Sequence, residues 1–265
     1  MELNGAHVLI TGSSRGIGAA MAREFAAKGS RVSLAARSHT AITTLAAEVK
    51  GTAFTVDLLD PVQVDDLIPR VEDEVGPIDV LVNNAGVENT SWFKDETVQR
   101  IRDVIRLNLE APLVLTRAVL PHMLTRGHGH LVCTSSLAGT AGFPGLAPYS
   151  ASKAGLNNFV AALRLELRDS PIRLTLVAPG PVDTEMWDHL EQTADLAPML
   201  KRLRVLQLIP KKSPELLARR TVAAVSANRR HVRVPRRLSA TFWLGESPRR
   251  VVEAVLTGVP LGGRS

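Results

Sequence analysis

The chain has 265 residues, with a formal net charge of +6 and a composition that is 45% hydrophobic, 22% charged and 4% aromatic. This balance is typical of a globular protein of one or two domains and excludes a fibrous or intrinsically disordered chain. The single cysteine, Cys133, excludes an intrachain disulfide. Because the sequence shows neither a run of about 18 apolar residues nor a signal-peptide pattern, we expect a cytoplasmic protein.

Short apolar runs alternate with amphipathic stretches as far as Gly180. We expect strands over residues 7–11, 31–36, 52–57, 78–84, 130–136 and 172–180. We expect helices over residues 16–29, 40–50, 61–75, 96–126 (with Pro112 marking a break or a new start) and 149–169. Such alternation predicts right-handed crossovers and a parallel sheet covered on both faces. The fold class is therefore α/β, a single doubly wound Rossmann-type domain.

The pattern changes after Gly180. Residues 184–227 predict two or three helices, with breaks at Pro198, Pro210 and Pro214. A last strand is expected over residues 231–235, and a basic helix from Ser247 to about Thr257. We expect the chain to divide into a cofactor-binding and catalytic core (1–183), a helical region of the same domain (184–230) and a C-terminal extension (231–265).

A glycine-rich turn, TGSSRGIG, joins the first strand to the first helix and contains Gly12, Gly16 and Gly18. In this context the backbone N–H groups and the helix dipole can bind the pyrophosphate of a dinucleotide. The alternative is a purely structural turn.

Tyr149 and Lys153 are four residues apart in a predicted helix, so their side chains share one face. A phenol is a poor acid or base at neutral pH, and a nearby ammonium lowers its pKa. Ser136 follows a predicted strand, at the edge where parallel sheets place their sites, and its hydroxyl could stabilise a developing oxyanion. Ser135 is the competing candidate.

TGSSRGIG, NNAG (83–86), Asn108, Ser136 and YSASK (149–153), in this order, resemble the short-chain dehydrogenase/reductase family over residues 5–185. The resemblance implies an oxidoreductase that uses a nicotinamide cofactor, with Tyr149 as acid/base, Ser136 holding the substrate oxygen and Lys153 tuning the phenol and holding the ribose. It also implies that Asn108 holds a water linked to Lys153; the alternative for Asn108 is packing or a helix kink. The family's usual glycine-bearing loop, strand and Asp-Gly-Gly ending are missing.

The resemblance also implies a set of cofactor-binding residues, some with competing roles. Asp57 could instead cap a turn, and Thr184 could instead cap a helix. The set comprises Gly12, Ser14, Arg15, Gly16, Ile17, Gly18, Arg37, Asp57, Leu58, Asn84, Ala85, Gly86, Tyr149, Lys153, Pro179, Gly180, Val182 and Thr184.

Two arginines predict the cofactor preference. Enzymes that use NAD(H) place an acid at the end of the second strand, where this chain has Ala36 followed by Arg37. Arg15 lies in the glycine turn, and guanidinium groups bind phosphate well. We therefore expect NADP(H) to be preferred over NAD(H). The alternative is that both arginines are solvated surface charges.

The positive charge is concentrated at the end of the chain. Residues 1–200 carry 17 basic and 23 acidic residues, a net charge of −6, whereas residues 201–265 carry 15 and 3, a net charge of +12. This region could pack on the domain or on a second copy, contact an anionic membrane surface together with Phe242 and Trp243, or attract an anionic substrate. No nucleic-acid-reading motif accompanies it, so no nucleic acid is expected.

The segment near 185–209 lies where the family places its substrate lid, and its apolar residues predict a hydrophobic ketone or secondary alcohol. By resemblance we expect a homodimer or higher homo-oligomer through the helices at 96–126 and 149–169. No metal site is expected. His128 and His130 are expected at the surface or in turns, and Cys133 as an inert buried thiol. The alternative to an enzyme is a cofactor-binding regulatory protein or one associated with a membrane surface.

Overall fold

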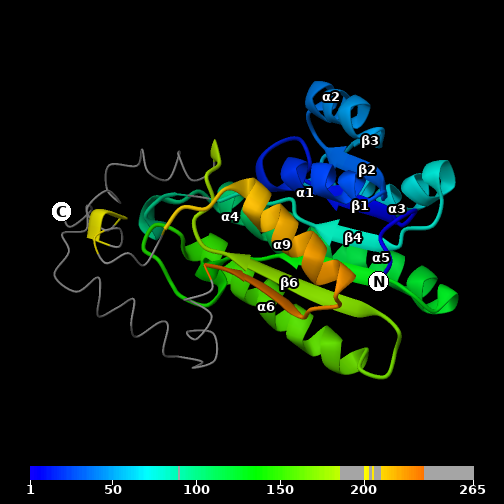
Figure 1. Cartoon of the computed structure of the whole chain (residues 1–265). Coiled ribbons are helices and arrows are strands. Elements are labelled where there is room, and N and C mark those ends of the chain that lie inside the picture. Colours follow the sequence, from blue (N-terminus) through cyan, green and yellow to red (C-terminus); the bar gives the residue numbers. More distant parts are fainter. Residues whose placement is uncertain (89, 186–199, 203–204, 206–209, 236–265) are drawn as a thin grey trace.

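The computed structural model describes residues 1–88, 90–185, 200–202, 205 and 210–235 (Figure 1). Its centre is a parallel seven-stranded sheet in the order β3-β2-β1-β4-β5-β6-β7. The strands are β1 (His7–Thr11), β2 (Arg31–Ala36), β3 (Thr52–Thr55), β4 (Val80–Asn83), β5 (His130–Thr134), β6 (Arg173–Pro179) and β7 (His231–Val234).

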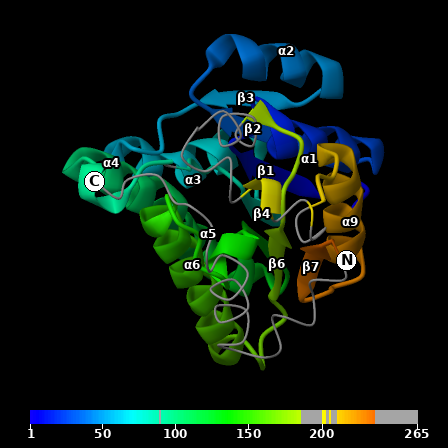
Figure 2. The same cartoon turned by 90° about the vertical axis from the view of Figure 1, so that its left-hand side faces the viewer.

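Helices cover both faces of the sheet (Figure 2). One layer comprises α1 (Gly16–Ala27), α2 (His39–Val49) and α9 (Pro214–Ser226). The other comprises α3 (Pro61–Val75), α5 (Ala111–Arg126) and α6 (Ala147–Glu166), with α4 (Val98–Ile105) beside α6. Along β1, Val8 and Ile10 pack into the first layer and Leu9 into the second, as the alternation of side chains along a strand requires.

The order of the strands reverses beside β1. The chain runs from β1 outward through β2 to β3, and then returns to place β4 on the other side of β1. Crossovers therefore leave the carboxyl ends of β1 and β4 in opposite directions, and this divergence opens a crevice between the connecting turns. This crevice is where the predicted site residues meet.

The predicted α/β class and parallel sheet are confirmed, with strand ends that differ by a few residues. Pro112 lies in the first turn of α5 but marks neither a break nor a new start, because the backbone stays right-handed helical from α4 through the unexpected π-helical segment Arg106–Glu110 into α5. Pro214 opens α9, where the Ser213 hydroxyl accepts a hydrogen bond from the Leu216 N–H. Pro198 and the helix predicted from Ser247 lie outside the described residues.

His130 is not at the surface. It is buried in β5, where its Nε2 lies 2.8 Å from Thr175 Oγ1, and burial lowers its pKa to about 4. The strand begins at His130 as predicted, but the surface or turn role expected for this histidine is wrong, because its ring packs against Thr175 of β6. No helix in the part of the chain that the structure describes is long and apolar enough to cross a membrane.

Candidate functional site

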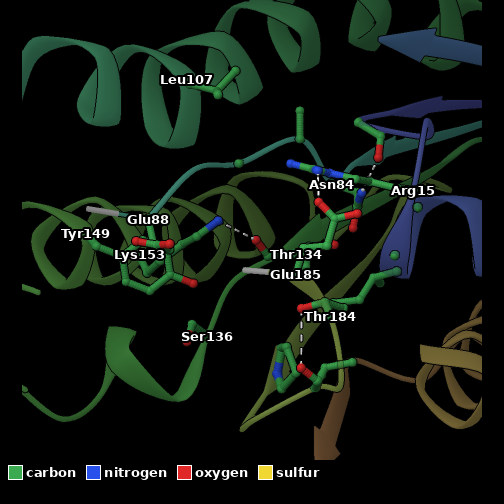
Figure 3. Close-up of a pocket in the computed structure, with 18 of the residues that line it drawn as sticks. Arg15, Asn84, Glu88, Leu107, Thr134, Ser136, Tyr149, Lys153, Thr184 and Glu185 are labelled. Carbon is green, nitrogen blue, oxygen red and sulfur yellow. Dashed lines mark hydrogen bonds and ion pairs between the residues drawn. The ribbon is translucent and has the colours of Figure 1, made fainter. Parts of the chain in front are cut away.

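A cavity of about 920 Å³ lies at the carboxyl ends of the central strands. Its wall is formed by the turn between β1 and α1 and by the segments that follow β2, β4, β5 and β6 (Figure 3). Every residue predicted for cofactor binding lines this cavity, and so do Ser136, Tyr149 and Lys153. Asn108 is the predicted site residue that does not line it.

The glycine turn packs directly against the end of β4. A Cβ on Gly12, whose φ is +66°, would lie 2.6 Å from the Cα of Ala85. A Cβ on Gly18 would lie 2.2 Å from the carbonyl oxygen of Gly12. Asn84 fastens the contact, because its Nδ2 donates to the carbonyl oxygens of Thr11 at 3.1 Å and Gly12 at 3.3 Å. Larger side chains at these glycines would therefore separate the turn from the strand.

The first turn of α1 faces the cavity and is suited to an anion. Arg15 occupies the N-cap position without a capping side-chain hydrogen bond, and the first turn contains no acidic residue. Gly16, Ile17 and Gly18 all line the cavity. Helix N-terminal N–H groups and the helix dipole favour negative charge at such a position. The turn therefore fits the pyrophosphate of a dinucleotide.

Ser136 and Tyr149 meet on one side of the cavity. The Ser136 hydroxyl hydrogen-bonds the Tyr149 phenol and so lowers its pKa, whereas burial, the larger effect, and the negative charge of Glu88 raise it. The net result is a raised pKa for Tyr149 in the protein alone. Ser135, the competing candidate, donates instead to the carbonyl oxygen of Lys153 at 3.3 Å. The structure thus places Ser136, and not its neighbour, beside the phenol.

The ammonium group of Lys153 is buried, with an exposed fraction of 4% for the residue. Its Nζ donates to the carbonyl oxygen of Thr134 at 2.9 Å and lies 5.8 Å from the centroid of the Tyr149 ring. Burial lowers the pKa of Lys153 to about 8. The predicted i, i+4 relationship therefore does place the amine and the phenol on one face of α6.

Asn108 lies beneath the cavity, fully buried in the π-helical segment. Its Oδ1 accepts from the Val87 N–H at 2.9 Å, and its Nδ2 donates to the Val87 carbonyl at 2.8 Å and to Ser152 Oγ at 3.1 Å. A Cβ on Gly86 would lie 3.1 Å from Asn108 Oδ1 and 3.4 Å from Lys153 Nζ. Asn108 thus holds the segment after β4 against α6, close to the amine.

The two arginines predicted to select the cofactor are exposed, and both line the cavity. Arg15 pairs with Glu185 across the mouth of the site, a contact that the sequence did not indicate. Asp57 does cap a turn, since its Oδ1 accepts from the Leu59 N–H at 3.0 Å, and it also lines the cavity. Thr184 lies close to the glycine turn, because a Cβ on Gly16 would be 3.3 Å from its Cγ2.

Sequence reasoning missed part of the wall. Glu88, two residues after the NNAG motif, is largely buried and lines the cavity. The sequence did offer one sign of this role, namely an acidic residue only two positions after a motif that ends a predicted strand. Apolar residues that were not predicted line the cavity too: Leu107, Leu137, Phe143, Leu146 and Leu200.

Comparison with known proteins identifies the family. The short chain dehydrogenase family model matches residues 6–195. The chain belongs to the short-chain dehydrogenase family. It is accordingly an oxidoreductase of the kind that acts on CH–OH groups, and the resemblance seen in the motifs is confirmed.

A ketoacyl reductase, HetN, of Nostoc sp. is 39% identical over 185 residues, which span 68% of this chain and 64% of that protein. A short-chain dehydrogenase from Sphingobium yanoikuyae, solved with NADPH, is 26% identical, with a TM-score of 0.79 over 98% of this chain and 100% of its own. One from Burkholderia phymatum, solved with NAD, has a TM-score of 0.81 over 100% and 99%, and at 23% identity it supports the fold alone.

Cys133 is buried in β5, as expected. Burial raises the pKa of the Cys133 thiol to about 11, which makes it a poor nucleophile. Within the described ranges, no three His, Cys, Asp or Glu side chains gather in a way that could hold a metal ion.

The packing of the glycine turn makes a prediction. Gly18→Ala should lower the free energy of unfolding by about 1–3 kcal/mol, because its methyl group overlaps the Gly12 carbonyl, and should weaken dinucleotide binding. Gly142→Ala is the matched control, since a Cβ there meets nothing within 4 Å, and it should change stability by less than about 0.5 kcal/mol. Urea unfolding and NADPH fluorescence titration measure both effects. Equal behaviour of the two variants would contradict the close-packed turn.

Proposed function

We propose that the chain is an NADP(H)-dependent oxidoreductase that interconverts a carbonyl and a secondary alcohol on a largely hydrophobic substrate. The observation that carries this proposal is the convergence of Ser136, Tyr149 and Lys153 on one part of a cavity whose other part offers a helix N-terminus free of acidic residues and two arginines. The first part suits acid/base chemistry on an oxygen, and the second suits a phosphorylated dinucleotide.

The residues around the cavity fit such a cofactor along its length. The first turn of α1 would bind the pyrophosphate, and Asp57 and Leu58 would line the adenine pocket. The segment 84–86 would support the middle of the cofactor, the backbone at Val182 would meet the carboxamide of the nicotinamide, and Thr184 would contact the cofactor. Lys153 would hold the nicotinamide ribose. When bound, the nicotinamide supplies or accepts the hydride.

Tyr149 would transfer the proton to or from the substrate oxygen. Burial raises the pKa of Tyr149 above its ordinary value, so the phenol carries the proton that donation to a carbonyl requires. The Ser136 hydroxyl lies against the phenol and can hydrogen-bond the same oxygen as charge develops on it. The Lys153 ammonium, 5.8 Å from the ring centroid, favours the phenolate that remains after donation. Asn108 would hold the segment that follows β4 in position beside the Lys153 amine.

The NADP(H) preference rests on charge. Arg15 and Arg37 line the cavity, and the residue that ends β2 is Ala36, which cannot accept hydrogen bonds from the ribose hydroxyls through its side chain. Glu185 competes for Arg15, so a 2′-phosphate would have to displace it from the guanidinium. Arg37 is therefore the stronger single determinant in this proposal.

The proposal extends to the substrate and to the assembly of the protein. Phe143, Leu146 and Leu200 give the cavity an apolar wall that suits a hydrophobic ketone. Residues 1–183 would form the core, 184–230 the lid and 231–265 the extension. A homodimer through the helices at 96–126 and 149–169, a cytoplasmic location and contact of the basic tail with an anionic membrane remain parts of the same proposal.

Tyr149→Phe tests the chemistry, because it removes one oxygen atom and the only proton the ring can donate. Turnover of ketones with NADPH should fall by at least about 100-fold, the usual scale for loss of a positioned acid. The dissociation constant for NADPH should stay within about twofold, since the ring remains in place. Stopped-flow absorbance at 340 nm and calorimetry measure the two quantities. Wild-type turnover in the variant would overturn the assignment.

Arg37→Ser tests the cofactor preference. The loss of a charge-assisted hydrogen bond to phosphate should raise the NADPH dissociation constant by about 10- to 100-fold and leave that of NADH within about twofold. Arg23→Ser is the control, because Arg23 is an exposed arginine of α1 that pairs with Glu48 and does not line the cavity. Equal weakening of both cofactors by Arg37→Ser would remove Arg37 as the determinant.

A further inference from the structure

Glu88 is a carboxylate in the wall of the cavity that the acid/base chemistry does not use. It follows β4 by five residues, and its exposed fraction is only 8%. Its contacts include Thr90 Oγ1, which donates to its Oε2 at 3.0 Å, and Arg100 Nη2, which donates to its carbonyl oxygen at 3.2 Å. Its backbone is thus fastened to α4, and its side chain is oriented by a neighbouring hydroxyl.

The carboxylate lies on the side of the cavity where a substrate would bind. Figure 3 shows Glu88 beside Tyr149, away from Arg15 at the other end of the site. Its charge reaches the phenol, whose pKa it helps to raise. A carboxylate so close to the acid/base residue is within reach of a substrate that reacts there.

A carboxylate in the wall opposes the binding of an apolar molecule, because the carboxylate loses hydration when such a molecule covers it. Phe143, Leu146 and Leu107 also line the cavity. Partial burial weakens the hydration of a carboxylate, and an apolar ligand that covers it weakens the hydration further. A ligand that offers a hydrogen-bond donor offsets this loss, whereas a ligand with an anion at the same position is repelled. Glu88 therefore discriminates between substrates of the same shape.

We propose that Glu88 is a substrate-recognition residue, which accepts a hydrogen bond from an amino or hydroxyl group carried near the reacting carbon of an otherwise apolar ketone or alcohol. The substrate class is then an amino ketone or hydroxy ketone, or the corresponding amino alcohol or diol. A substrate with a protonated amine at this position binds most tightly, and a substrate with a carboxylate there is repelled. The inference rests on the proposed function and names the substrate class of the same site.

The test uses four aryl ketones that differ only in one substituent on the carbon next to the carbonyl: aminomethyl, hydroxymethyl, ethyl and carboxymethyl. The purified full-length protein is assayed with NADPH as wild type, Glu88→Gln and Asp95→Asn. Asp95→Asn is the matched control, because it removes an exposed carboxylate from the same connection without touching the cavity wall. We expect the wild type and the control to prefer the amino and hydroxy ketones over the ethyl ketone.

In Glu88→Gln the ratio of kcat/KM for the amino ketone to that for the ethyl ketone should fall by at least about tenfold, mainly through KM, as expected for loss of one charged hydrogen bond. The hydroxy ketone should lose less, because the amide oxygen still accepts, and the carboxylate ketone should improve. A wild type without the preference, or a variant that slows all four ketones equally, would overturn the proposal; equal slowing would mean that Glu88 acts only through Tyr149 or the fold.

Failure of the proposed function has a different signature, namely that no ketone of the series is reduced by the wild type. The same ratio is then taken from dissociation constants, measured by calorimetry with the NADPH-saturated wild type and Glu88→Gln. A tenfold loss of amino-ketone preference in binding supports the recognition role without turnover. Equal binding of the amino and ethyl ketones overturns it.

Discussion

The buried ammonium of Lys153 is the group on which the arrangement of this site depends. Removal of a positive charge from water is costly, and the lowered pKa of about 8 is a direct sign of that cost. The Thr134 carbonyl at the end of β5 accepts a hydrogen bond from the ammonium, and the absence of a side chain on Gly86 leaves room beside it. The centroid of the Tyr149 ring lies 5.8 Å from this ammonium, and Asn108 also lies beside Gly86.

The sheet brings these groups together because parallel strands all end at one edge. The glycine turn follows β1, and the segment that carries Asn84 and Glu88 follows β4. Ser136 follows β5, whose Thr134 carbonyl accepts the hydrogen bond from Lys153. The π-helical segment between α4 and α5 adds Asn108 from below, and single-turn π segments are frequent at functional sites. Phosphate binding and proton transfer can therefore occur at two ends of one cavity.

Much of this was predictable from the sequence because it depends on local periodicity. Apolar runs separated by amphipathic stretches predict the strands, and spacing alone places Tyr149 and Lys153 on one face. The Arg15–Glu185 pair and the burial of Glu88 depend on contacts between segments far apart in the chain. The π segment lacked a local signal, and the burial of His130 depends on its contact with Thr175 of β6, far along the chain.

The most direct test of the account replaces the buried charge. Lys153→Met keeps the length of the side chain and removes the ammonium. Mass spectrometry follows the transfer of deuterium from C4-deuterated NADPH to the carbonyl carbon of a ketone, and thermal unfolding gives the Tm of the variant. If the ammonium acts in proton transfer, deuterium transfer should fall by at least about 100-fold in the variant. Because burial of the charge destabilises the fold, the Tm should stay within about 2 °C of the wild type or rise. Wild-type transfer in the variant, or a large fall in Tm, would contradict the account.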